Sequence, residues 1–309
     1  MSELFGIRYQ LQIGDNAEYL DIELRDDSYN SGHSLRIAFL VQHEIGGYIS
    51  FAEISIYNMS EANEDSIFEK YRSVTLQAGF RELFGPVFKG QVINVQRIPG
   101  GADGTRGIKL FCRSSAEAAN YNTVNQSLGA SASASDVIRA CAQALGNPII
   151  FSGDFDSLPK RARGTVLQGN PITILNSLMK SFDFTWTIEN GITKIIRNGY
   201  QVEGEMFLFS SRTGMIGSPI VTDTEISVRV ALNPVVQLGR KIKIESTAPE
   251  FAFSGAYFVN IPRSIGEGIY QVSRIVHVGD SHGQTWETQL NCLRLDASDQ
   301  ATLAGRISQ

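Results

Sequence analysis

Apolar and polar residues alternate along several short stretches in the first third of the chain. The clearest stretches are residues 8–13, 20–24 and 35–39, and the pattern returns at residues 52–57 and 74–79. Alternation with a period of two places one face of a β-strand against a core and leaves the other face to solvent. The first third of the chain is therefore predicted to consist of short strands joined by turns.

Three segments carry the signals of helix starts instead. Ser60 precedes two glutamates and is placed to cap a short helix over residues 60–70 with an acidic first turn. Ser135 precedes an apolar stripe at helical spacing and is the predicted cap of a second helix. Asn170, followed by Pro171 at the first helical position, predicts a third helix.

The second and third helices belong to a stretch in which helices and strands are mixed. Residues 149–151 predict a short strand between them. After the third helix, the dipeptide Asn190-Gly191 separates the alternating residues 184–188 from residues 192–196. Because Asn-Gly between alternating strands is the strongest short-range hairpin signal, this stretch is predicted to be a small α+β unit.

Strand patterns return in the last third of the chain, at residues 226–230, 241–246 and 269–278. Between the last two lies a predicted loop, residues 247–268, with large apolar side chains that cannot all stay in water. These side chains either pack onto their own module or meet another chain, and the second reading is the one we adopt. The candidate interface residues are Phe251, Phe253, Tyr257 and Phe258.

Two hairpin patterns 180 residues apart resemble each other. The spacing from Val92 to Cys112 equals the spacing from Val272 to Cys292, and each pair encloses a glycine-rich turn. A repeated β-module is typical of chains built for assembly, although coincidence between two ordinary hairpins is the alternative.

These patterns predict a mainly β protein in which two related β-barrel modules flank a small α+β domain. The N-terminal module covers residues 1–113, and the middle domain covers residues 114–198. The C-terminal module covers residues 199–296, and residues 297–309 are predicted to be a flexible tail.

Composition narrows the classes of function. The chain has 309 residues with 42% hydrophobic and 19% charged residues, which is typical of a globular protein. The net charge of −5 gives no overall attraction for nucleic-acid phosphates. Residues 1–10 hold no signal-peptide pattern, and no segment approaches the ~20 apolar residues that span a bilayer. Three distant cysteines match neither a disulfide framework nor a zinc motif and are read as buried thiols in a reducing compartment.

The strongest candidate for chemistry is the trio His277, Asp280 and His282, whose side chains are of types that bind divalent metals. His277 lies on a predicted strand, whereas Asp280 lies in a tight turn and is expected to accept hydrogen bonds from its own backbone. A metal-dependent hydrolase therefore remains only an alternative. A carbohydrate-binding β-module is another, but Trp186 and Trp286 both fall within strand patterns. We predict no catalytic residue, no metal and no cofactor.

Several motifs resemble those of phage baseplate hub proteins. In the last third they are SRTGMIGSP at residues 211–219, Val228-Arg229-Val230, Leu232-Asn233-Pro234 and residues 268–292 with VGDSHG and WET. In the first third they are LRIAF at residues 35–39, ISIYNMS at 54–60, LQAG at 76–79 and FKG at 88–90. In order and spacing the chain is similar to a Mu-like contractile-tail hub, a family related to the hubs of type VI secretion systems.

This resemblance implies a structural protein without catalysis. It implies a homotrimer whose modules form a ring between the sixfold tail tube and a threefold central spike, with the spike a separate polypeptide. DNA would pass through the channel without specific binding, and the middle domain would face the surrounding baseplate wedge proteins. The resemblance further implies a place in the virion baseplate, assembly in the cytoplasm of a bacterial host, and no membrane insertion.

Overall fold

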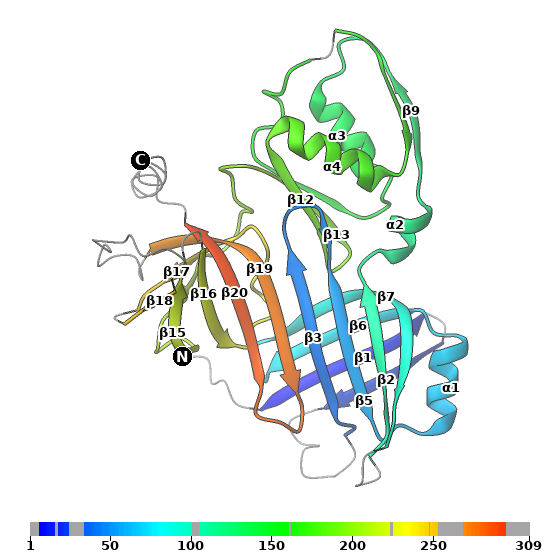
Figure 1. Cartoon of the computed structure of the whole chain (residues 1–309), viewed down its shortest axis with the longest axis vertical. Coiled ribbons are helices and arrows are strands. Elements are labelled where there is room, and N and C mark those ends of the chain that lie inside the picture. Colours follow the sequence, from blue (N-terminus) through cyan, green and yellow to red (C-terminus); the bar gives the residue numbers. More distant parts are fainter. Residues whose placement is uncertain are drawn as a thin grey trace.

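The computed structural model describes residues 6–15, 18–24, 34–100, 105–160, 162–222, 225–246, 248–252 and 268–294. It confirms the predicted fold class, because strands dominate and a small α+β unit lies between two β-rich parts of the sequence (Figure 1). Most strands belong to one continuous sheet, whose main path has the order β18-β15-β16-β20-β19-β3-β5-β8-β7-β6-β1-β2.

The first part of this sheet comes from the N-terminal third of the chain. Its strands bury alternate residues, as Tyr9, Leu11 and Ile13 do in β1. Helix α1 (Glu61–Glu69) begins after Ser60 as predicted, although the Ser60 side chain makes no capping hydrogen bond. The strands are β1 (Ile7–Asp15), β2 (Glu18–Leu24), β3 (Ile37–Glu44), β5 (Phe51–Tyr57), β6 (Ser73–Phe80), β7 (Phe84–Ile98) and β8 (Gly107–Arg113).

The second part of the sheet comes from the C-terminal third. Its buried face includes Val228, Val230, Ile242 and Leu290. The predicted loop over residues 247–268 contains a two-residue strand, β18, which pairs in parallel with β15. The strands are β14 (Phe207–Phe209), β15 (Met215–Val221), β16 (Glu225–Ala231), β17 (Lys241–Ile244), β18 (Glu250–Phe251), β19 (Gly268–Asp280) and β20 (Trp286–Arg294).

The two parts repeat one another strand for strand. In the first, neighbouring antiparallel strands run in the order β3-β5-β8-β7-β6, and in the second they run in the order β15-β16-β20-β19-β17. The echo between the two hairpins is therefore structural. Val92 faces Cys112 as Val272 faces Cys292, and each strand then carries a β-bulge at the next residue, Ile93 or Ser273.

The repeat extends to a hydrogen bond outside the hairpins. The Val92 backbone N–H donates to the Arg72 carbonyl at 2.7 Å, and the Val272 N–H donates to the Arg240 carbonyl at 3.0 Å. Arg72 and Arg240 directly precede equivalent strands, β6 and β17, of the two modules. We call these two five-stranded units the N-terminal and C-terminal modules below.

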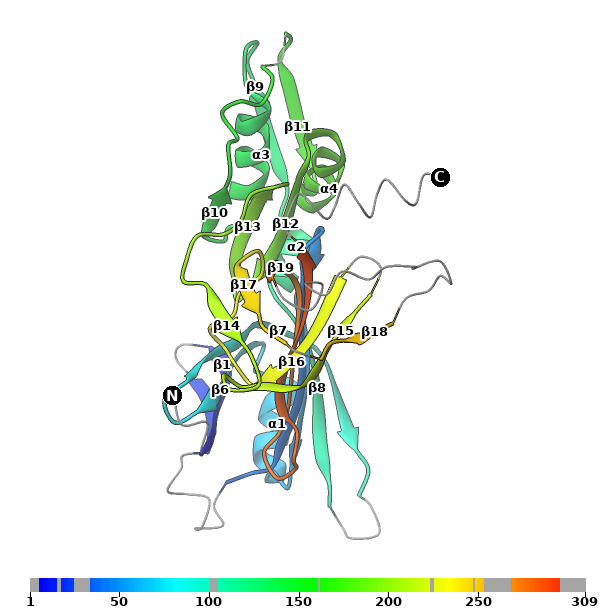
Figure 2. The same ribbon diagram turned by 90° about the vertical axis from the view of Figure 1, so that its left-hand side faces the viewer.

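The middle of the chain forms a compact α+β unit at one end of the molecule, beyond both modules (Figures 1 and 2). Its four-stranded sheet has the order β10-β13-β12-β4, so the short strand β4 of the N-terminal third joins it. The elements are β4 (Tyr48–Ile49), α2 (Ala116–Tyr121), β9 (Val124–Leu128), α3 (Ala134–Gln143), β10 (Ile149–Ser152), β11 (Thr165–Gly169), α4 (Pro171–Phe182), β12 (Phe184–Glu189) and β13 (Ile192–Arg197).

The local predictions for this unit meet different outcomes. Asn170 caps α4 as predicted, because its side chain accepts from the Ile172 and Thr173 N–H groups. Asn190-Gly191 forms the turn between β12 and β13 with both residues at positive φ. The prediction for α3 was wrong by two residues. Ser133, not Ser135, is the cap, because Ser133 and Asp136 form a reciprocal capping box.

Candidate assembly surface

The two modules are joined edge to edge inside the chain. β19 pairs antiparallel with β3 from Arg274 opposite Glu44 to Asp280 opposite Ala38. Side chains extend the ladder at one end, where the Ile37 N–H donates to Ser281 Oγ at 3.0 Å. The Arg36 guanidinium also donates to both carboxylate oxygens of Asp280, at 3.1 and 2.6 Å. The joint is therefore a continuous β-ladder that is closed by an ion pair.

Trp286 fixes the C-terminal module against the core of the N-terminal module. Its indole N–H donates to the Gly79 carbonyl at 3.0 Å. Its ring meets Phe39 edge to face, with 5.3 Å between the ring centroids. The backbone of Gly279 passes so close that a Cβ there would lie 2.4 Å from Phe39 Cζ and 2.7 Å from Trp286 Cζ3. Only a residue without a side chain fits at position 279.

Two buried histidines face each other across the joint. The rings of His43 on β3 and His277 on β19 lie 5.9 Å apart, edge to face. His43 contacts Ser50 Oγ at 2.7 Å and the Val87 carbonyl at 2.8 Å, and His277 contacts Thr288 Oγ1 at 2.8 Å. Burial lowers the pKa of His43, and burial and the neighbouring ring hold the pKa of His277 well below its usual value. His277 is therefore neutral at physiological pH.

The middle unit is anchored to both modules through buried polar contacts. Ser50, which contacts His43, donates to the Ile188 carbonyl at 2.6 Å. On the other side, the buried carboxylate of Glu189 pairs with the Lys194 ammonium inside the middle unit. Lys194 also donates to Gln237 Oε1 of the C-terminal module at 3.3 Å. This buried network couples the position of the middle unit to the C-terminal module.

The structure does not gather the trio considered as a metal site. His277 is buried against Thr288, whereas Asp280 holds Arg36 and accepts from the His282 backbone N–H at 3.0 Å. The hydrogen bond from Arg36 is the main reason that the pKa of Asp280 lies below its usual value. Among the described residues, no group of three or more His, Cys, Asp or Glu side chains is arranged to hold a metal ion. The predicted turn at Asp280 is thus present, and its arginine partner was not predicted.

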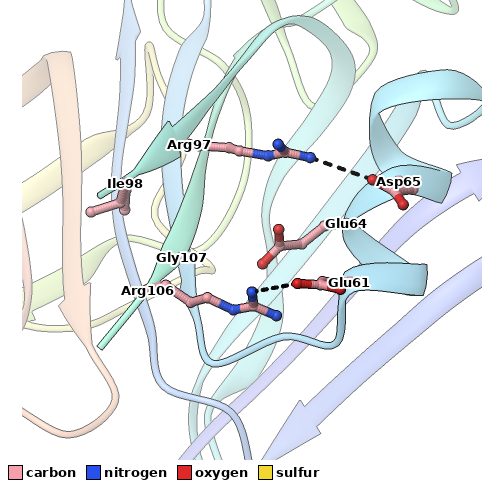
Figure 3. Close-up of a pocket in the computed structure, with 7 residues that line it drawn as sticks. All are labelled: Glu61, Glu64, Asp65, Arg97, Ile98, Arg106 and Gly107. Atoms are coloured by element: carbon pink, nitrogen blue, oxygen red, sulfur yellow. Dashed lines mark hydrogen bonds and ion pairs between the residues drawn. The ribbon is translucent and has the colours of Figure 1, made fainter. Parts of the chain in front are cut away.

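A cavity of about 320 Å³ lies between α1 and the β7–β8 hairpin (Figure 3). Glu61 pairs with Arg106 at 2.8 Å, and Asp65 pairs with Arg97 at 3.4 Å. Between these pairs, the side chain of Glu64 points into the cavity, and its buried Oε1 has no hydrogen-bond partner among the described residues. Both ion pairs are exposed to solvent, so they orient the hairpin more than they stabilise it.

The aromatic candidates fall mostly outside the part of the chain that the structure describes. Phe253, Tyr257 and Phe258 are not among the described residues. The backbone of Phe251 ends β18 opposite Val221 of β15. The joint between β3 and β19 was not predicted as a functional surface. The hairpin echo was the available signal, because it marked β19 as the counterpart of an N-terminal strand.

Sequence and structure comparisons place these features among known proteins. A family profile described as baseplate hub gp41 matches residues 50–261. A comparison with curated proteins finds no significant match. No helix among the described residues is long and apolar enough to span a membrane.

Three solved structures share the fold at low identity. The Escherichia coli c3393 protein has a TM-score of 0.58 and 7% identity, covering 86% of this chain and 76% of its own. It is described as a type VI secretion component similar to the T4 tail proteins gp27 and gp5. The 43 kDa tail protein of prophage MuSo2 from Shewanella oneidensis has a TM-score of 0.57 and 9% identity, covering 94% and 99%. The tail protein from Neisseria meningitidis MC58 has a TM-score of 0.56 and 9% identity, covering 94% and 97%.

Proposed function

Since the chain belongs to the baseplate hub gp41 family, a tail baseplate component of phages, we propose that it acts as a homotrimeric adaptor between tail tube and central spike. Its role is structural and not catalytic. Each chain supplies two copies of one β-module, so three chains present six similar modules in a ring. Such a ring matches a sixfold tube on one side and a threefold spike on the other.

The observation that carries this proposal is the duplicated module with its internal edge-to-edge joint. The two copies share their strand order and the bulge after Val92 or Val272, and β19 and β3 hold them side by side in one sheet. The joint fixes the rotation that relates one module to the next within a chain. A closed ring can form when the same rotation is repeated between modules of neighbouring chains.

The division into units forms part of the proposal. The proposed boundaries are residues 1–113, 114–198 and 199–296, with a tail at 297–309. Three clusters of buried side chains, each drawn mostly from one of the first three ranges, favour this division, although Leu232 and Trp286 pack in the first cluster. The middle unit, placed beyond both modules, would face the surrounding baseplate wedge proteins (Figure 1). The modules would line a channel for DNA, and a net charge of −5 favours a wall that does not grip phosphates. The complex would assemble in the bacterial host cytoplasm.

We also propose an assembly contact in the aromatic segment that starts at the last residue of β18. Its residues are Phe251, Phe253, Tyr257 and Phe258. The combination Phe253→Asp with Phe258→Asp is expected to abolish rings and infectivity, since burying an unpaired charge at an interface is costly. Tyr121→Asp is the matched control for ring formation alone, because Tyr121 is exposed in the middle unit and outside both modules. Infectious particles that carry both Phe substitutions would exclude this contact.

Mass measurement and electron microscopy of the purified chain test the central proposal. A particle of three 33.9 kDa chains, with a central hole and six lobes, is expected. The measurement is repeated with the spike protein added, because the spike offers a threefold template for closure. Absence of threefold rings both alone and with the spike would refute the adaptor role.

A further inference from the structure

The two modules have one equivalent strand edge each. In the C-terminal module this edge pairs with a strand of the same chain, whereas in the N-terminal module no described strand pairs with it. In the C-terminal module, β3 covers the edge of β19 from Arg274 to Asp280. In the N-terminal module, the equivalent edge belongs to the second half of β7, and no described strand pairs with it. The bulge residue shows the difference, because Ser273 is 7% exposed whereas Ile93 is 49% exposed.

The repeat also identifies the strand of the C-terminal module that is equivalent to β3, namely β15. β3 lies beside β5, and β15 lies beside β16, while Ala52 of β5 and Ile226 of β16 each face one of the equivalent cysteines. Ala52 faces Val41 of β3, and Ile226 faces Val221 of β15, so Val41 and Val221 are equivalent. The residues directly before them, Leu40 and Ile220, are therefore equivalent as well. Both of these side chains are 39% exposed. β15 therefore carries the edge that fits β7.

Resting on the proposed trimer, we propose that β15 of a second copy pairs antiparallel with the open edge of β7, in the register that β3 takes on β19. Within the chain, Val278 faces Leu40 and His277 faces Val41. Transferring these pairs through the repeat places Ile98 opposite Ile220 of the second copy, and Arg97 opposite its Val221. The contact joins unlike edges, so it closes into a ring when the rotation between neighbours permits.

The side chains at the two edges agree with this pairing. Ile93 on β7 and both Ile216 and Ile220 on β15 are exposed in the single chain. Ion pairs from α1 orient the β7–β8 hairpin through Arg97 and Arg106. Pairing with a second copy would cover the exposed apolar side chains and supply hydrogen bonds to an unpaired strand edge.

In the single chain, β18 covers part of the β15 edge. It pairs with Ile220 and Val221, and the Ala252 N–H donates to the Val221 carbonyl at 2.9 Å. A two-residue strand is a short cover of the kind that keeps sheet edges from pairing prematurely. The incoming β7 must displace it, so β18 leaves β15 when the ring forms.

Disulfide trapping tests the register in the full-length chain. The variant Ile98→Cys with Ile220→Cys is expected to give reducible dimers and trimers, and no larger species, on oxidation. Val278→Cys with Leu40→Cys is the internal reference. These two residues face each other within one chain and are equivalent to Ile98 and Ile220, so their disulfide forms without linking two chains. Ile98→Cys with Ile216→Cys is the out-of-register control and is expected not to link. The native cysteines are buried, and burial raises the pKa of the Cys141 thiol to about 11, so they do not compete.

A second measurement needs no substitution. Backbone amide exchange over Ile93–Ile98 in the native chain is expected to slow on trimer formation, while exchange at residues 250–252 speeds up. Trimers that neither link at positions 98 and 220 nor protect this segment would overturn the register and leave the adaptor role intact. A chain that stays monomeric with and without the spike would contradict the trimer itself.

Discussion

Replacing Gly279 with alanine is expected to destabilise the joint between the two modules. The added Cβ would lie 2.4 Å from Phe39 Cζ and 2.7 Å from Trp286 Cζ3, whereas carbon atoms in contact prefer ~3.5–4.0 Å. One or both rings must therefore move by about 1 Å, and both are buried in the core of the N-terminal module. Overpacking of this kind costs about 1–3 kcal/mol, and we expect the free energy of unfolding to fall by about 2 kcal/mol.

Urea denaturation, followed by tryptophan fluorescence, measures this change as a lower midpoint of the transition. Gly129→Ala is the matched control, because a Cβ at Gly129 meets nothing within 4 Å. That control is expected to be neutral or to stabilise by about 0.4–1 kcal/mol through the unfolded state. Phe39→Leu in the Gly279→Ala background removes the closest ring atoms and is expected to recover part of the loss. Equal midpoints for the Gly279 and Gly129 variants would refute the steric argument.

Two further predictions concern buried ionisable groups. Stability toward urea is expected to fall as the pH is lowered from 7.5 to 5. Burial lowers the pKa values of His43 and His277 in the folded chain, so these side chains take up protons near pH 6.5 only in the unfolded chain. Lowering the pH therefore favours the unfolded state. His43→Gln with His277→Gln is expected to flatten this dependence between pH 5 and 7, and an unchanged slope would contradict the assignment of neutral buried imidazoles. Lys194→Met leaves the buried Glu189 carboxylate without its partner and is expected to cost about 3–5 kcal/mol. Adding Glu189→Gln is expected to restore much of this loss in the same denaturation assay, and a double variant no more stable than the single one would show that burial of the charge is not the cause.

Signals that act over a few residues were readable from the sequence. Asn170 before proline and Asn190-Gly191 between alternating strands each specify a backbone conformation directly, and both are found where they were predicted. The cap of α3 was misplaced because Ser133 and Ser135 both precede the same apolar stripe. Only the reciprocal bond between Ser133 and Asp136 decides between them.

Elements whose sequence lacks a periodic pattern of apolar residues were not predicted. In the ribbon formed by β9 and β11, β9 buries only Val124 fully, and the adjacent apolar residues Val166 and Leu167 of β11 hide its alternation in the sequence, because Val166 is exposed and only Leu167 is buried. The pairing of β3 with β19 could not be predicted from the sequence either, although both strands were predicted. Backbone hydrogen bonds between strands more than 200 residues apart leave no residue signature, and Arg36 gives no sign in the sequence that it meets Asp280. The candidate surface could therefore be inferred only as a repeat, and its joint required the structure.

The joint between β3 and β19 is made mainly by main-chain groups, which every amino acid except proline supplies in full. Such a joint tolerates mutation at most ladder positions, since the hydrogen bonds remain when the side chain changes, whereas Gly279 opposite Phe39 has no room for a side chain. After a gene segment is duplicated, the two copies can therefore drift apart in sequence and still dock at the same angle. This accounts for a repeat that keeps the pairing of Val92 with Cys112 and of Val272 with Cys292 but has few other identities. It also fits the occurrence of this fold in a type VI secretion component and two tail proteins with only 7–9% identity to this chain.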